Sequence, residues 1–420
     1  MVEEAIAGAQ PPAEVPPRRR FSTFASLQYR DFRFLWFGQV GHAASLWMEQ
    51  IVRPLLILQL TDSALMVGLV VAARMLPMLF FGLIAGVAAD RLDRKRILLT
   101  TQWVTMSMHA LMAVLVFTDV IQPWHVFATT FVSGSSMAFN QPSRQSLIPQ
   151  MVPREALLNA VALNTTAINL MRVLGPAIAG LLLFTGFGAI YTLNAVMIGG
   201  VMVCTYLMQI KRMPRASETP TGWLDDLKEN FAFVARTPAV LSVMGPALIL
   251  FVFGLPYQSV FVPLFAKKVL DIGDSGAAAL VMVTGVGAIV GSLVMASQTT
   301  MRRRGVLLIA FLAVFGTGLL VFSRSTYLPV SVVFLMAAAS MSTSYMALTN
   351  SLLLELSPPD MHGRVMSLLS LDRGLVPLGA TIGGALAAAI GPQDGLLVMA
   401  CVILALTASV AVFSPALRRL

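Results

Sequence analysis

Long apolar stretches follow one another along almost the whole chain, separated by short polar intervals. A membrane-spanning helix needs about 20 mostly apolar residues, and twelve stretches approach or exceed that length. We predict spans near residues 34–59, 65–88, 97–118, 124–148, 157–184, 189–210, 239–265, 276–298, 305–323, 328–354, 365–390 and 395–414. The pattern therefore predicts an all-α membrane protein with twelve transmembrane helices.

The composition agrees with a polytopic membrane protein, because 57% of the 420 residues are hydrophobic and only 12% are charged. Soluble domains carry roughly 25% charged residues. The net charge of +9 has a topological explanation, since the twelve-span arrangement places 21 of the 29 lysines and arginines on one side of the membrane. Basic residues are retained in the cytoplasm. We therefore expect both termini to be cytoplasmic and no nucleic acid to be bound.

The longest polar interval after the N-terminal tail divides the predicted spans into six and six. We expect a cytoplasmic tail, an N-terminal half, a cytoplasmic linker, a C-terminal half and a second cytoplasmic tail, at residues 1–33, 34–210, 211–238, 239–414 and 415–420 respectively. Within the linker, apolar and charged residues alternate at helical spacing over residues 223–235, which predicts an amphipathic helix on the membrane surface.

Two short segments of the first half recur in the second half about 205 residues later. Residues 145–153 resemble residues 350–358, and residues 174–180 resemble residues 378–384. A shared offset indicates a duplicated six-span unit. Repeated halves are an architecture of secondary transporters, which bind their substrate between the halves near the middle of the membrane.

The loop between the second and third predicted spans carries a dense motif, GVAADRLDRKR at residues 86–96. Gly86 permits close approach of another helix, and Asp90 is placed to face the positive N-terminus of a neighbouring helix. The motif resembles the GxxxDRxGRK loop of the major facilitator superfamily, with Asp93 in place of the second glycine. The resemblance implies a cytoplasmic gate, to which we assign Gly86, Asp90, Arg91, Arg94, Lys95 and Arg144.

Three further segments narrow the resemblance to one branch of that superfamily. YRDFR at residues 29–33, PSRQSL at residues 142–147 and RVLGPA at residues 172–177 look like the enterobactin-exporter-like, or transmembrane secretion effector, group. The likeness covers nearly all of the chain after residue 21. It implies a monomeric, proton-driven exporter of siderophores, drugs or other small molecules in the bacterial cytoplasmic membrane.

Charged residues inside the predicted spans are the candidates for chemistry, because each costs about 2.5 to 3.5 kcal/mol to insert. Glu49 and Arg53 lie one helical turn apart on one face, and Arg74 lies at a similar depth in the next span. The candidates for substrate binding and proton coupling are Glu49, Arg53, Arg74, Arg172, Asp372 and Arg373. The excess of arginines over acids favours an anionic or zwitterionic substrate.

Two interpretations of Glu49 stay open: a carboxylate that carries a proton, and a permanent ion-pair partner of the arginines. Asp372 and Arg373 point about 100° apart on one helix, which favours a gate salt bridge over proton carriage. His42 and His109 could titrate near neutral pH. A hydrogen-bonded packing role is the expectation for both.

Several classes of protein are disfavoured by missing motifs. The sequence has no Walker-type phosphate loop, no His and Cys cluster at metal-binding spacing and no GxSxG nucleophile motif. We expect neither an enzyme nor a metal or cofactor site. The expected function is proton-coupled export of a small organic molecule across the lipid bilayer. An importer or symporter of a small anionic metabolite, a lipid flippase and a non-transporting membrane sensor remain alternatives.

Overall fold

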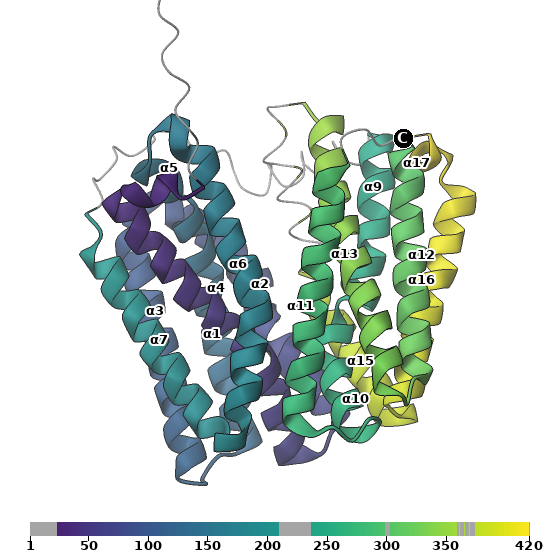
Figure 1. Ribbon diagram of the computed structural model, residues 1–420, viewed down its shortest axis with the longest axis horizontal. Coiled ribbons are helices and arrows are strands. Elements are labelled where there is room, and N and C mark those ends of the chain that lie inside the picture. Colours follow the sequence, from purple (N-terminus) through teal and green to yellow (C-terminus); the bar gives the residue numbers. More distant parts are fainter. Residues whose placement is uncertain are drawn as a thin grey trace, which may run out of the picture.

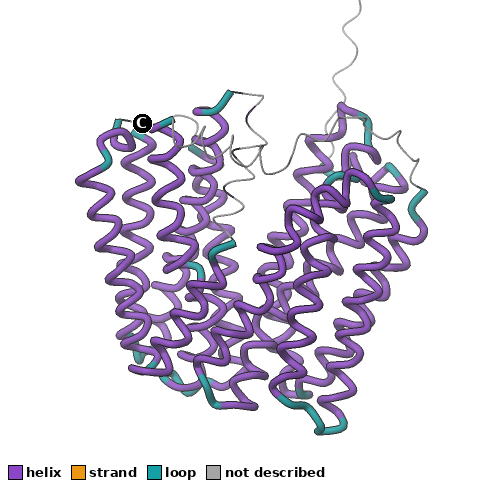
Figure 2. The backbone as a smooth tube through the Cα atoms, turned by 180° about the vertical axis from the view of Figure 1, so that it is seen from behind, coloured by secondary structure: helices purple, strands orange, loops and turns teal. Residues whose placement is uncertain are grey.

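The computed structural model describes most of the chain and shows only helices, turns and loops in that part (Figure 2). The described residues are 23–209, 237–298, 303–358, 361, 365, 369 and 374–419, with the side chains of residues 83, 86–91 and 238 left out. The predicted surface helix at residues 223–235 and most of the N-terminal tail lie outside this part.

The first six predicted spans are matched by long helices. They are α1 (Arg30–Thr61), α2 (Ala64–Arg91), α3 (Arg94–Phe117), α4 (Pro123–Gln145), α6 (Arg154–Leu182) and α7 (Phe187–Leu207). Shorter elements connect or precede them: η1 (Ala25–Gln28), α5 (Ile148–Met151) and η2 (Leu183–Thr185). Pro153, which cannot continue a helix from the preceding residues, separates α5 from α6.

The later spans follow the same pattern, with one irregular member. The seventh consists of α9 (Pro238–Leu248), the π-helical segments η3 (Ile249–Gly254) and η4 (Tyr257–Phe261), and α10 (Val262–Lys268). The others are α11 (Gly273–Ser297), α12 (Arg304–Arg324), α13 (Leu328–Leu356), α15 (Val376–Ile390) and α16 (Pro392–Phe413), followed by the short α17 (Pro415–Arg418). Only the second part of the eleventh predicted span is described.

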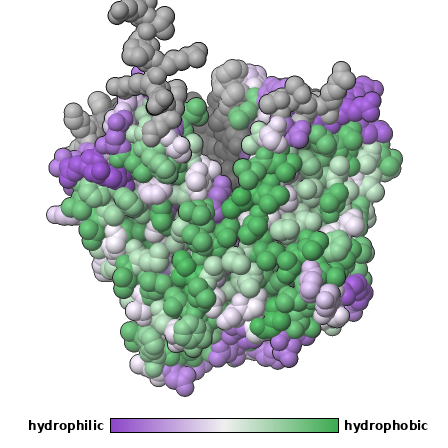
Figure 3. Space-filling view, in the orientation of Figure 1, coloured by the Kyte–Doolittle hydropathy of each residue, from purple (hydrophilic) through white to green (hydrophobic). Residues whose placement is uncertain are grey.

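Nine helices of the described residues are long and apolar enough to cross a membrane. The helices α1 and α4 are not among them. Both carry polar side chains that the bundle buries, such as Glu49 and Arg53 in α1 and Ser133 and Asn140 in α4. Hydropathy alone therefore underrates helices whose polar face points into the protein. Figure 3 shows a mostly hydrophobic middle band with hydrophilic residues along the top and bottom edges of the visible face.

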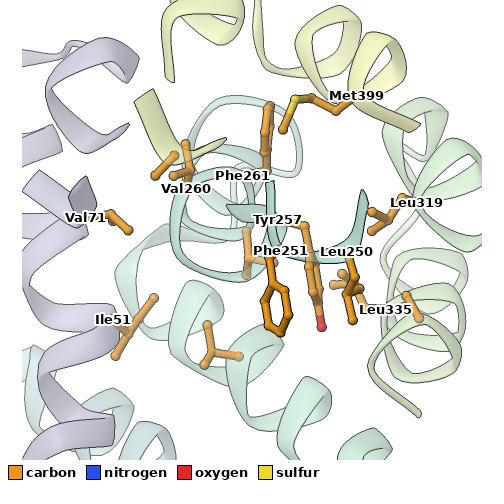
Figure 4. Close-up of a cluster of buried hydrophobic side chains, with 14 of the residues drawn as sticks. Ile51, Val71, Leu250, Phe251, Tyr257, Val260, Phe261, Leu319, Leu335 and Met399 are labelled. Carbon is orange, nitrogen blue, oxygen red and sulfur yellow. The ribbon is translucent and has the colours of Figure 1, made fainter. Parts of the chain in front are cut away.

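The helices form two bundles, with α1 to α7 on one side and α9 to α17 on the other (Figure 1). We call them the N-terminal and C-terminal halves. Each half buries its apolar residues internally, and the seventh span lies where the halves meet. In Figure 4, Tyr257 and Phe261 of this span lie between Ile51 of α1 and Leu319 of α12. The core is therefore continuous from one half to the other.

The halves touch through helices α2 and α15 and through helices α6 and α11. The approach is close at Gly68, where a Cβ atom would lie 2.3 Å from the carbonyl oxygen of Ala380 and 3.0 Å from the Cα atom of Gly384. The second contact brings Ser275 against Gly180, whose carbonyl oxygen accepts a 3.1 Å hydrogen bond from the serine hydroxyl. Both contacts lie toward the membrane side opposite the C-terminus (Figure 1).

An ion pair joins the halves on the same side. Lys268, at the end of α10, donates to the Asp62 carboxylate at 2.8 Å and to its backbone carbonyl oxygen at 3.0 Å. The hydrogen bond and the charge of Lys268 lower the pKa of Asp62. The adjacent Lys267 instead pairs with Asp274 of its own half, at 2.9 Å. We call the Asp62–Lys268 pair the latch.

Breaking the latch should loosen the contact between the halves. We expect Lys268→Met to lengthen the distance between spin labels at Val120 and Tyr327, exposed residues near this side of opposite halves. The paired state should lose population by up to about fivefold, because exposed ion pairs contribute little. Double electron–electron resonance in a background lacking Cys204 and Cys401 measures the distance.

Lys267→Met is the matched control and should leave this distance unchanged. The low pKa of Asp62 sets the sign of the pH dependence: the latch is intact at neutral pH and is lost as the pH falls through that lowered value. Equal effects of the two lysine substitutions would contradict a role that depends on bridging the halves.

The glycine contact should tolerate no side chain. Gly68→Ala places a Cβ atom against the backbone of α15, which cannot move without shifting the whole helix. We expect it to separate the spin labels more than the latch variant does, and to destabilise the protein by about 1 to 3 kcal/mol. Gly200→Ala, at a helical glycine with nothing within 4 Å of its Cβ position, should be neutral or slightly stabilising in thermal unfolding.

Candidate functional site

The central feature of the N-terminal half is a buried carboxylate surrounded by cations. Glu49 and Arg53, which are 5% and 2% exposed, lie one turn apart on α1 and form an ion pair. The Nε atom of Arg53 donates to the Glu49 carboxylate at 2.8 Å. Its Nη2 atom also contacts this carboxylate and donates to the Ser133 hydroxyl of α4 at 3.2 Å.

Two further helices complete this site. The Nη2 atom of Arg74, from α2, lies 3.7 Å from the second carboxylate oxygen of Glu49 and donates to the carbonyl oxygen of Leu46 at 3.4 Å. From α3, the Nδ1 atom of His109 lies 3.3 Å from Glu49, and its Nε2 atom lies 3.4 Å from the Ser45 hydroxyl. We call Glu49, Arg53, Arg74 and His109 the Glu49 cluster.

The Glu49 cluster carries more positive than negative charge, since two arginines face one carboxylate even when His109 is neutral. An unpaired buried charge costs several kcal/mol, so the carboxylate of Glu49 stabilises the two buried arginines that face it. The predicted meeting of Glu49, Arg53 and Arg74 is present in the structure. His109 was expected to be a packing residue, and its contact with Glu49 is the part that the sequence did not indicate.

Arg172 lies outside the Glu49 cluster, next to the contact between the halves. Its guanidinium group lies 5.2 Å from the ring centroid of Trp47 in α1, and its backbone oxygen lies 2.9 Å from the Cβ position of Gly285 in α11. Within the described residues, its Nε atom and the hydroxyl of the neighbouring Tyr257 are buried without a hydrogen-bond partner. Donors from both halves therefore lie close together here.

Arg144 is buried more deeply than its expected position at the end of a span suggested. It is 3% exposed and lies 3.3 Å from the Cβ position of Gly38. None of its three guanidinium nitrogens has a hydrogen-bond partner in the described part of the chain. A buried arginine of this kind lies inside the N-terminal half, where its charge raises the electrostatic potential of the polar interior.

The loop between α2 and α3 binds the ends of other helices of its own half. Arg94 donates to the carbonyl oxygen of Ser146 at 3.2 Å, and Lys95 donates to the carbonyl oxygens of Tyr206 and Met208 at 2.7 Å each. Asp93, the departure from the superfamily pattern, caps α3 by accepting hydrogen bonds from the backbone N–H groups of residues 95 and 96. The carboxylate therefore replaces the glycine with a stabilising N-cap.

Other predicted residues cannot be placed. Asp372 and Arg373 lie outside the described residues, as do the side chains of Gly86, Asp90 and Arg91, although residues 86–91 are helical in α2. The cytoplasmic gate therefore stays a prediction. Among the described residues, no group of three or more His, Cys, Asp or Glu side chains is arranged to hold a metal ion.

The arrangement of two helical bundles is shared with solved membrane transporters. The fold matches a bacterial homologue of the human lysosomal transporter Spinster in an inward-facing, unoccupied conformation, with a TM-score of 0.74 and 16% identity, covering 93% of this chain and 97% of that one. It also matches a D-xylose–proton symporter, with a TM-score of 0.71 and 13% identity, covering 95% of this chain and 100% of that one. These likenesses show the fold, and the sequence match over residues 21–419 to a family of membrane transporters assigns the protein to the major facilitator transporters and not to the enzymes.

The particular family follows from the sequence. Residues 21–419 match the transmembrane secretion effector family, and the chain belongs to it. It is 24% identical over 395 residues to macrolide efflux protein A of Streptococcus pyogenes, covering 89% of this chain and 93% of that one. The multidrug efflux pump Tap of Mycolicibacterium fortuitum is 28% identical over 380 residues (87% and 91%). The staphyloferrin A transporter of Staphylococcus aureus is 23% identical over 347 residues (80% and 84%).

Removing one partner of the buried pair should destabilise the protein strongly. We expect Arg53→Met to cost about 3 to 5 kcal/mol, because it leaves Glu49 buried with weaker neighbours. The double variant Glu49→Leu, Arg53→Met should recover most of the loss. Thermal unfolding in detergent measures both. Arg324→Met removes the exposed Arg324–Asp394 pair and should change stability by less than about 1 kcal/mol. Additive losses in the double variant would contradict the pairing.

Proposed function

We propose that the protein exports a small organic molecule across the cytoplasmic membrane in exchange for protons, and that Glu49 carries the proton. One observation supports most directly that Glu49 binds the proton and not the substrate. Glu49 and Arg74 line a cavity of only about 30 Å³ inside the N-terminal half. Sites for organic ligands measure roughly 300 to 1,000 Å³. The cavity is large enough for water and protons and too small for the substrate.

The substrate would then bind between the halves, where alternating access exposes it to each side in turn. Arg172 is the candidate ligand there, because it lies beside Trp47 at the contact with α11. With both termini in the cytoplasm, contacts on the opposite side leave the cytoplasmic side free to load substrate. The names of the macrolide, multidrug and siderophore relatives support export of a drug-like or siderophore-like molecule.

The relatives and the cavity disfavour the alternative functions for different reasons. An importer or symporter requires the opposite flux on the same fold, and the efflux relatives disfavour it. A sensor or flippase that uses Glu49 only as an ion-pair partner would need no cavity beside the carboxylate. The cavity at Glu49 favours proton exchange over a permanent pair.

Transport in proteoliposomes tests the proposal. A panel containing erythromycin, as a macrolide, is offered under a pH gradient of two units, which supplies about 2.7 kcal/mol per proton. We expect the wild type to concentrate at least one compound. Glu49→Gln should lose uphill transport and keep exchange without a gradient, because it mimics the protonated carboxyl group.

Glu155→Gln, at an exposed acid in the first turn of α6, is the control and should transport like the wild type. Uphill transport by Glu49→Gln at the wild-type rate would show that Glu49 is a structural partner of the arginines and that another residue carries the proton.

A further inference from the structure

The cavity beside Glu49 belongs to the N-terminal half alone. Its walls come from five helices, α1, α2, α3, α4 and α7, and no described residue of the C-terminal half lines it. Besides Glu49, the polar lining that matters here is His42, Thr105, His109 and Asn140. Protons and substrate thus have separate compartments available: the interior of one half and the space between the two halves.

Two atoms around this cavity are buried without a hydrogen-bond partner in the described part of the chain. They are the Nδ1 atom of His42 and the Oδ1 atom of Asn140. The amide nitrogen of Asn140 is engaged, because it donates to the Thr101 hydroxyl at 2.9 Å, which directs the free oxygen elsewhere. Buried polar atoms around a common space are usually satisfied by water.

The volume of the cavity is sufficient for water molecules. One water molecule needs about 10 to 15 Å³ of such space, so about 30 Å³ holds one or two. His42 lies seven residues before Glu49 on α1, about 10 Å along the helix axis. This span is too long for direct contact and suits a bridge of one or two waters. His42 is partly exposed as a residue while its Nδ1 atom is buried, which suits a residue that passes a proton beyond the cavity.

We propose that His42 relays protons between Glu49 and the solvent through water in this cavity, along a route inside the N-terminal half. The O–H bond of protonated Glu49 breaks as its proton passes to a cavity water. A proton of that water then bonds to Nδ1 of His42, and Nε2 of the imidazole releases its proton to solvent. The sequence is reversible and needs no other reactant. It rests on the proposed proton carriage by Glu49.

The ionisable groups around the relay explain why a neutral carrier is needed. Those facing the cavity or its neighbours from the surrounding helices are His42, Glu49, Arg53, Arg74, His109, Arg144 and Tyr191. The three arginines repel a free hydronium ion. When the transfers are concerted, so that Nε2 of His42 releases its proton as Nδ1 accepts one, neither hydronium nor imidazolium is left beside them.

Infrared spectroscopy after a rapid drop in pH tests the relay without any substrate. The protein is reconstituted in lipid, and the carboxyl C=O band of protonated Glu49 is assigned by its absence in Glu49→Gln. We expect His42→Leu and Asn140→Leu to slow the appearance of this band by at least tenfold. The midpoint pH at equilibrium should stay unchanged, because a relay alters the rate of protonation only.

Thr130→Val is the matched control, since Thr130 is a buried hydroxyl residue of α4 that does not line the cavity. It should protonate Glu49 at the wild-type rate. If His42→Leu fails to fold, His42→Gln, which keeps a polar side chain that does not relay protons efficiently, takes its place.

Wild-type rates in the His42 and Asn140 variants would overturn the relay and leave proton carriage by Glu49 intact. A shifted midpoint with an unchanged rate would likewise overturn it, by showing a structural role only. A wild-type protein with no Glu49 band at any pH would instead refute proton carriage by Glu49 itself, and the relay with it.

Discussion

The organisation of the N-terminal half depends on providing partners for one ionisable carboxyl group inside a bundle that must face lipid on its outside. Lipid offers no hydrogen bonds and little screening, so Glu49 requires partners from the protein. Arg53 on the same helix provides the first, while Arg74 and His109 bring α2 and α3 to the same point. The ion pair therefore determines how these helices face one another, and the apolar residues fill the space that remains.

A second constraint acts between the halves, where two helices can meet only if they lack side chains at the contact. The absence of a Cβ atom at Gly68 lets α2 reach the backbone of α15. Small contact residues give helix pairs in membranes their affinity through packing. Such a contact involves no buried charge. The Glu49 cluster lies within one half, so the alternating access proposed above would leave its contacts in place.

The sequence correctly predicted the helical class and most spans, because the length of an apolar run indicates whether a segment can span the lipid bilayer. It also predicted that Glu49, Arg53 and Arg74 meet, because depth and helical spacing are both countable. It did not reveal the role of His109. A single histidine in an apolar span has no partner within its own helix, and its contact with Glu49 depends on the rotation of α3, which packing decides.

The arginines show the same limit of sequence reasoning in two ways. Arg144 was assigned to a gate from its motif, which stays a prediction, and the sequence did not indicate that its side chain is buried inside the N-terminal half. Arg172 was a candidate for substrate binding and proton coupling together with Glu49, and its guanidinium group instead lies over Trp47 near the other half. Depth along a helix can be counted from the sequence, whereas the direction of a side chain around the helix requires knowledge of its neighbours.

Proton release on substrate binding tests the central claim most directly, because an exchanger must lose its proton as it binds its substrate and the linkage is reciprocal. The purified protein in weakly buffered solution, with a pH indicator, is mixed with a compound that the wild type transports. The account predicts release of about one proton per molecule bound by the wild type and by Glu155→Gln, and none by Glu49→Gln. Substrate binding to the wild type without proton release, or undiminished release from Glu49→Gln, would contradict it.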